Sequence, residues 1–182
     1  MILAREQLGI MTTNAEFLQL MAQAYADDRH AFDRLTVLRS SDNPEIRTTA
    51  ILAVSAILDS MERNYLLAQN NLTPNWKGIG IDPDTNSLQQ LEAFYGVQDQ
   101  AVRKHLLDYV AKTDRYSKRD RFDFVVMVLQ HDDHLSMVNQ ACEIMDHESK
   151  LGVNVLAANR YVVWWQENRS KSDGTNTVEL HP

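Results

Sequence analysis

Hydrophobic positions recur every three or four residues along most of this chain, which is the spacing of one face of an α-helix. The clearest stripe follows Pro44 and comprises Ile46, Ala50, Ala53, Ile57, Met61 and Tyr65. Proline is well tolerated at the start of a helix, because the N–H that it lacks would have no helical partner there. We therefore expect one long helix from Pro44 to about Gln69.

Polar caps mark the starts of other helices. Thr13 with Glu16, and Ser87 with Gln90, have the spacing of a capping box. We expect the helix after Ser87 to end at Gly96, since glycine is typical of the residue that follows a helix. The apolar spacing predicts further helices over residues 30–39, 99–112, 122–130, 133–148 and 153–168. The charged run 115–121 is interpreted as a solvated connector.

Three segments repeat one set of apolar offsets, with steps of three, eight, four and three residues. The sets are Leu35, Leu38, Ile46, Ala50 and Ala53; Leu91, Phe94, Val102, Leu106 and Tyr109; and Val126, Leu129, Met137, Ala141 and Ile144. A polar turn lies within each step of eight, so each segment is predicted to be a helical hairpin. Residues 122–130 also alternate as a strand would, and the repeat favours the helix. A lone hairpin cannot bury its apolar face, so such units stack.

The first hairpin resembles a HEAT repeat at Asp42-Asn43-Pro44-Glu45-Ile46-Arg47, followed by Ala50, Ala53 and Ile57. The second keeps Asp99, Val102 and Arg103 without the proline, and the third keeps only the acidic turn and the apolar positions. The resemblance covers about residues 30–148, with a long insertion at 70–86, and implies stacked antiparallel hairpins. An irregular helical bundle is the alternative, because any antiparallel helix pair can produce these offsets. Both interpretations predict an all-α fold.

The chain has 182 residues with only 6 Gly and 4 Pro, a composition that favours helices and is sufficient for one domain with its own core. We expect a single helical domain over residues 11–168. Residues 1–10 precede Met11 and the first capping box, and are interpreted as an N-terminal extension. Residues 169–182 are polar and are predicted to form a flexible C-terminal tail.

The formal net charge of −7 restricts the classes of partner. Binding to nucleic acid or to an anionic membrane surface requires clustered basic residues, so both are disfavoured. A nucleic-acid binder of the HEAT type would have to use Arg47, Arg103, Lys104 and Arg121 on a concave face. Solubility by itself accounts for the acidic charge, and a protein partner with a basic surface is the alternative.

The expected compartment is the cytoplasm. The single cysteine, Cys142, excludes an internal disulfide and fits a reducing environment. It lies among apolar helical positions, which favours a small buried side chain over a nucleophile. No apolar run reaches the length of about 18 residues that a membrane-spanning helix requires. The residues after Met1 also lack the charged-then-apolar pattern of a signal peptide.

The stretch His131-Asp132-Asp133-His134 carries the residue types of a divalent metal site. Histidines three residues apart can share one helix face, and the His-Asp pair resembles the paired ligands of HD-type phosphohydrolases. That resemblance implies metal-dependent phosphohydrolysis by His131, Asp132 and His134. The alternative is structural, with Asp132 or Asp133 capping the next helix. We prefer capping, because short motifs often arise by chance.

The loop Asp82-Pro83-Asp84-Thr85-Asn86 places oxygen atoms at alternate positions, as a calcium loop does. The glycine and the glutamate that close such a loop are replaced by Ser87 and Ala93. The preceding Ile79-Gly80-Ile81-Asp82-Pro83 resembles the first strand motif of RuvC-type nucleases, but a capped helix follows where that family has strands. A helix-capping loop is therefore the preferred interpretation.

The last predicted helix contains the aromatic cluster Tyr161-Val162-Val163-Trp164-Trp165. Successive residues lie about 100° apart around a helix, so Trp164 and Trp165 cannot both face the core. We expect one to be buried and the other to be a protein-interface anchor, with burial of both as the alternative. Trp76, in the long loop, is a second interface candidate, and pinning of that loop to the core is its alternative role.

These observations favour a non-catalytic module that binds another protein, as an adaptor or as an inhibitor of a basic partner. The candidate partners are a basic protein and a second copy of this chain, and no cofactor is expected. The positive support is architectural, since stacked helical hairpins form broad concave surfaces. The rival function is the metal-dependent phosphohydrolase, which a stoichiometric bound metal would favour.

Overall fold

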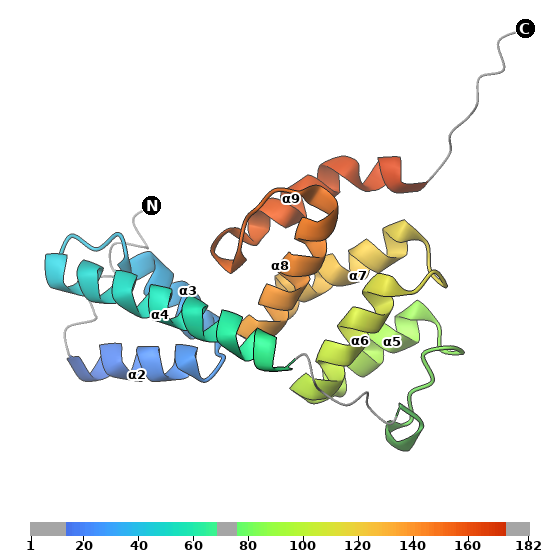
Figure 1. The fold of residues 1–182 in the computed structure, drawn as a ribbon, viewed down its shortest axis with the longest axis horizontal. Helices are drawn as coiled ribbons and strands as arrows, with labels where there is room; N and C mark the ends of the chain where they lie inside the picture. Colours follow the sequence, from blue (N-terminus) through green and yellow to red (C-terminus); the bar gives the residue numbers. More distant parts are fainter. Residues whose placement is uncertain (1–13, 69–75, 174–182) are drawn as a thin grey trace, which may run out of the picture. The chain divides into compact units, whose positions relative to one another are not determined.

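The computed structural model describes residues 14–68 and 76–173, and within these ranges the chain is built of helices without a strand. Eight α-helices and three short 3-10 helices follow one another along the described residues (Figure 1). The prediction of an all-α fold of packed helices is confirmed. In the same ranges, no helix is both long and apolar enough to cross a membrane.

The described residues fold into two compact units. Among the described residues, unit 1 comprises 14–68 together with Asp132–Ser136. Unit 2 comprises 76–131 and 137–173. The short segment Asp132–Ser136 thus completes unit 1 from a distant part of the sequence.

Unit 1 is a group of three helices: α2 (Asn14–Tyr25), α3 (Arg29–Leu38) and α4 (Pro44–Ala68). The central helix, α3, packs against both α2 and α4 (Figure 1). Its larger buried side chains are Phe32, Leu35 and Leu38, and α4 contributes Ala50, Ala53, Val54 and Ile57. Ala50, Ala53 and Ile57 of the stripe predicted after Pro44 therefore lie on the buried face of α4, Ile46 and Met61 are half-buried, and the Tyr65 side chain lies outside the described part of the chain.

The turn between α3 and α4 has the geometry that Pro44 predicts. Pro44 is the first residue of α4, and the side-chain oxygen of Asn43 accepts a hydrogen bond from the backbone N–H of Glu45 at 2.9 Å. The Arg47 guanidinium donates to the Ser41 carbonyl at 2.7 Å. These bonds satisfy backbone groups that would otherwise lack a partner at the helix start. The turn is compatible with a helical repeat.

Unit 2 contains α5 (Leu88–Val97), α6 (Gln100–Lys112), α7 (Lys118–His131), most of α8 (Leu135–Ser149), α9 (Asn159–Asn168), and the 3-10 helices η1 (Trp76–Ile79), η2 (Val155–Ala157) and η3 (Arg169–Asp173). α6 packs against α5 and α7, and α7 packs against α9 and η3 (Figure 1). The part of α8 in unit 2 buries Met137, Val138, Ala141, Cys142 and Met145. Cys142 is therefore a buried side chain, as predicted.

The three repeated sets of apolar positions lie on successive helix pairs. α3 and α4 carry the first set, α5 and α6 the second, and α7 and α8 the third. None of these positions is exposed, and most are buried. The ambiguous segment 122–130 lies within α7, so its helical prediction is confirmed.

Two helices have ends that differ from prediction. α5 continues through Gly96 to Val97, and Gln98 after it is extended. Asp99 then caps α6 by accepting a hydrogen bond from the Val102 N–H at 3.0 Å. Because the chain turns in an extended conformation, no left-handed residue is needed at Gly96, and the prediction that the helix ends there is wrong.

α7 begins at Lys118, earlier than predicted. The Ser117 hydroxyl accepts a hydrogen bond from the Asp120 N–H at 3.1 Å and donates to the Asp120 carboxylate at 2.8 Å. This local cap starts the helix within the charged run. Residues 118–121 are therefore the first turn of α7, and their interpretation as a solvated connector is wrong.

The C-terminal helical region also differs in detail. The Asn154 side chain accepts a hydrogen bond from the Leu156 N–H at 3.1 Å and starts the separate turn η2, so α9 begins only at Asn159. Beyond α9, η3 carries the helical path to Asp173. Residues 1–13, which include Thr13 of the first predicted capping box, and most of the predicted tail lie outside the described residues.

Candidate functional site

The aromatic cluster of α9 divides between the core and the surface. Trp165 is 2% exposed, and Tyr161, one turn earlier, is completely buried. Trp164 is half-buried, because the rotation of about 100° between neighbours turns it away from the buried face. Trp165 is therefore the core tryptophan, and Trp164 is the one that a partner could reach.

Trp165 is held by both its ring and its N–H. The ring lies 5.2 Å from the Phe122 ring, centroid to centroid. The indole N–H donates to one oxygen of the Asp123 carboxylate at 2.8 Å. Arg169 donates to the same carboxylate with two guanidinium nitrogens, at 2.6 and 2.8 Å. Two α7 residues thus fix the inner face of α9 and the start of η3.

The Asp123 carboxylate is stabilised in its charged form. Its partial burial acts to raise the pKa, but the hydrogen bonds from Arg169 and Trp165 outweigh burial and lower the pKa below its ordinary value. A depressed carboxylate pKa contributes stability above the unfolded-state pKa, and this contribution is lost as the pH falls through the folded-state pKa.

We expect Asp123→Asn to lower the free energy of unfolding at neutral pH by about 1 kcal/mol, since the ion pair with Arg169 is partly exposed. The difference from the wild type should be constant near neutral pH and shrink below about pH 4. Urea unfolding across a pH series measures this. Arg169→Gln removes the same ion pair from the other side and should change stability in the same direction. An unaltered pH dependence in Asp123→Asn would contradict the assignment.

The first turn of α9 is fixed by Tyr161. Its hydroxyl lies 3.0 Å from the Asp146 carboxylate and 2.5 Å from the Val153 carbonyl oxygen. The same Asp146 oxygen accepts a hydrogen bond from the Gly152 N–H at 2.6 Å. Burial, reinforced by Asp146, raises the pKa of Tyr161 far above its ordinary value, so the hydroxyl stays protonated at neutral pH. α9 is thus anchored from inside at both of its ends.

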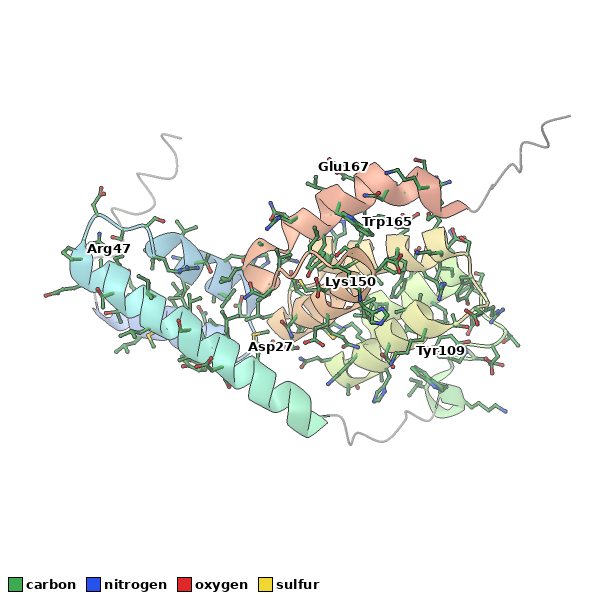
Figure 2. All side chains as sticks on the ribbon, turned by 45° about the horizontal axis from the view of Figure 1, so that its top comes forward. Asp27, Arg47, Tyr109, Lys150, Trp165 and Glu167 are labelled. Atoms are coloured by element: carbon green, nitrogen blue, oxygen red, sulfur yellow. The ribbon has the colours of Figure 1, made fainter. Side chains whose placement is uncertain are left out.

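The outward side of α9 carries a short mixed stripe, which we call the α9 stripe: Arg160, Val163, Trp164 and Glu167. Spacings of three and four residues place these side chains within an arc of roughly 100°. Val163 is 50% exposed, and Arg160 and Glu167 are also exposed. Figure 2 shows Glu167 on the outer side of the α9 ribbon and Trp165 on its inner side. Apolar side chains therefore lie between two opposite charges.

The charges of the α9 stripe are placed against the helix dipole. Arg160 lies in the first turn of α9 and Glu167 in the last, whereas the dipole favours an acid at the start and a base at the end. Each reversed charge costs about 0.3–1 kcal/mol in an exposed helix. Neither side chain has an ion pair or hydrogen bond with another residue of the described ranges. The placement therefore does not serve the stability of the helix.

Trp76, the third interface candidate, is half-buried in η1. The loop that follows it is held by other residues: Ile81 is 1% exposed, and the hydroxyls of Tyr109 and Tyr116 donate to the carbonyls of Pro83 and Asn86 at 3.2 and 2.8 Å. Figure 2 shows Tyr109 beside this loop. Docking of the loop therefore involves Ile81, Tyr116 and Tyr109, and the sequence pattern had placed Tyr109 only in the apolar repeat.

The oxygen atoms of the predicted calcium-like loop serve the loop itself. The Asn86 side chain accepts from the Asp82 N–H at 2.8 Å, and the Asp82 carboxylate accepts from the Asp84 N–H at 3.2 Å. Ser87 and Gln90 form the predicted capping box at the start of α5. These contacts agree with the preferred interpretation of a helix-capping loop.

The residues of the stretch His131-Asp132-Asp133-His134, which resembled a metal site, have different structural roles. His131 is the exposed last residue of α7. The Asp132 carboxylate is buried and accepts hydrogen bonds from the His134 N–H at 2.8 Å and from its ring Nδ1 at 3.2 Å. Within residues 14–68 and 76–173, no group of three or more His, Cys, Asp or Glu side chains is arranged to hold a metal ion.

The acidic cap of α8 comes from another part of unit 1. The Asp27 carboxylate accepts from the Ser136 N–H and from its hydroxyl, both at 2.7 Å. The Leu135 N–H donates to the Asp27 carbonyl at 2.9 Å, and the Arg29 N–H donates to the Asp133 carbonyl at 3.0 Å. Asp27 adopts a left-handed backbone with φ 78° to make these contacts. The second residue of α8, Ser136, is thus capped by Asp27, which the sequence analysis did not name, while Asp132 accepts from the N–H of His134, the residue before α8.

The basic residues nominated for nucleic-acid binding make contacts within the chain. Arg47 bonds to the Ser41 carbonyl, and the Arg121 guanidinium donates to the Ala111 carbonyl at 3.2 Å. The Arg103 guanidinium lies over the Tyr95 ring, 5.7 Å from its centroid. These three arginines therefore have local structural roles.

The sequence pattern did not identify Asp123, which accepts from Trp165, or its partner Arg169 in η3. One signal was present: Asp123 is a charged residue between Phe122 and Phe124, and a charge within an apolar run requires a partner. Nothing local identifies that partner as Arg169, which lies 46 residues later.

No protein-family model, curated protein or solved structure matches this chain. The resemblance of the α3–α4 turn to a HEAT repeat therefore depends on residues 42–47 and on the packing of the helices. Function must be inferred from the residues of the chain itself.

Proposed function

We propose that this chain is a non-catalytic helical module that binds another protein through the α9 stripe. The observation that carries the proposal is the half-buried Trp164 beside the exposed Val163, on a helix whose inner face is fixed by Trp165 and Tyr161. Tryptophan is enriched among the residues that dominate binding energy at protein interfaces. A fixed helix also loses little conformational freedom when a partner binds.

Other exposed apolar side chains support this role less well. Leu52 of α4 and Val97 of α5 are aliphatic and are more exposed than Val163. Single exposed aliphatic residues are common on protein surfaces. Trp164 differs, because tryptophan is enriched among the residues that dominate binding energy at interfaces, whereas leucine and valine are under-represented among them.

We extend the proposal to a partner with a basic surface and to a location in the cytoplasm. The net charge of −7 suits a partner with a basic surface, through faster electrostatic encounter. The single buried cysteine suits a reducing compartment such as the cytoplasm. The Pro44 turn and the paired helices suit a HEAT-like adaptor.

The test compares a glutamine substitution at Trp164 with a glutamine substitution at an exposed aliphatic residue, Leu52. Trp164→Gln should abolish capture of the proteins that the wild-type chain retains in a quantitative pull-down, because it removes the proposed anchor and leaves Trp165 in place. Leu52→Gln, a matched change on α4, should retain them. Circular dichroism should show that both variants are folded. If folded Trp164→Gln captures the same proteins as the wild type, the proposal is wrong.

A further inference from the structure

The order of residues in the α9 stripe is symmetric about its centre. Arg160 lies three residues before Val163, and Glu167 lies three residues after Trp164. A two-fold axis between positions 163 and 164 would therefore place Val163 of one copy opposite Trp164 of the other, and Arg160 of one copy opposite Glu167 of the other. The stripe is complementary to itself when two copies of α9 lie antiparallel.

We infer that the partner of the α9 stripe is a second copy of this chain, paired antiparallel about that two-fold axis. This inference rests on the proposed function and names its partner. In the pair, Trp164 of each copy covers Val163 of the other. Arg160 of each copy lies opposite Glu167 of the other, so symmetry produces two identical ion pairs.

Self-pairing also explains why Arg160 and Glu167 occupy positions that the helix dipole disfavours. In an antiparallel pair, the positive end of one helix lies beside the negative end of the other. Each charge then faces an opposite charge and the favourable end of the neighbouring helix. In a single chain, neither charge has a partner among the described residues.

The overall charge of the chain works against this pairing, while the charges of the stripe favour it. A net charge of −7 repels a second copy, but the stripe itself is electrically neutral, with one arginine and one glutamate. At physiological salt the Debye length is about 8 Å, so distant charges are screened more strongly than the contacting pairs. One short helix gives a small interface, and we therefore expect a weak, concentration-dependent dimer.

The test exchanges the charges. Sedimentation velocity over a concentration series should show reversible dimers of the wild type. Arg160→Glu and Glu167→Arg should each weaken the dimer roughly tenfold or more, because symmetry introduces each like-charge pair twice. An equal mixture of the two single variants should form a mixed dimer, since the introduced carboxylates face the introduced guanidinium groups. The double variant should dimerise as the wild type does.

Both single changes follow the preference of the helix dipole, so circular dichroism should show intact α9. A wild type that remains monomeric, or single variants that do not pair when mixed, would overturn the inference. If the chain is monomeric but Trp164→Gln still loses a different protein partner, self-pairing is wrong and the proposed function stands. If Trp164→Gln loses no partner of either kind, both are wrong.

Discussion

Replacing Ala53 by aspartate should lower the free energy of unfolding by at least ~3 kcal/mol. Ala53 is 3% exposed on the buried face of α4, the helix that packs against α3. The substitution places a carboxylate among apolar side chains and adds no positive group that could pair with it. The cost is the loss of hydration of that charge, or the work of protonating it at neutral pH.

Ser55→Asp is the matched control, because Ser55 lies on the same helix and is exposed. It introduces the same carboxylate into α4 in contact with water, so its stability should stay within about 0.5 kcal/mol of the wild type. Urea unfolding followed by far-ultraviolet circular dichroism compares the two. Similar stability of Ala53→Asp and Ser55→Asp would show that the apolar stripe of α4 does not face a core.

Replacing Trp165 by alanine should be at least as severe, with a loss of about 3–5 kcal/mol. The change removes the contact with the Phe122 ring and leaves a cavity where the indole lay. It also removes the donor that bonds to Asp123, which then keeps only Arg169 of the two groups that fix it. α9 would lose the Trp165 contacts with α7, and η3 would keep the bond from Arg169 to Asp123.

Trp164→Ala is the natural control, since it changes the same residue type one position earlier. Trp164 is half-buried, so its loss should destabilise the chain much less, by roughly 1 kcal/mol. Thermal and urea unfolding of both variants checks the difference. Equal destabilisation would mean that the two rings form one core cluster, and the surface role of Trp164 would then be untenable.

Local spacing in the sequence determined where the helices lie and which faces they bury. Ala50, Ala53 and Ile57 are buried because steps of three and four residues return to one side of a helix. Pro44 and the Ser87–Gln90 box identified two helix starts, since caps act within a few residues of the backbone groups that they satisfy. These features depend on neighbours in sequence, so they can be recognised without the fold.

Only the tertiary structure decided the contacts between distant residues. The sequence required that Trp164 and Trp165 face different ways, but the position of α7 decided that Trp165 is the buried one. Likewise, Asp27 caps α8 from a position 109 residues earlier, and Asp123 pairs with Arg169 across 46 residues. Periodicity describes the face of a single helix. It contains no information about which other helix covers that face, so such partners follow only from the packing.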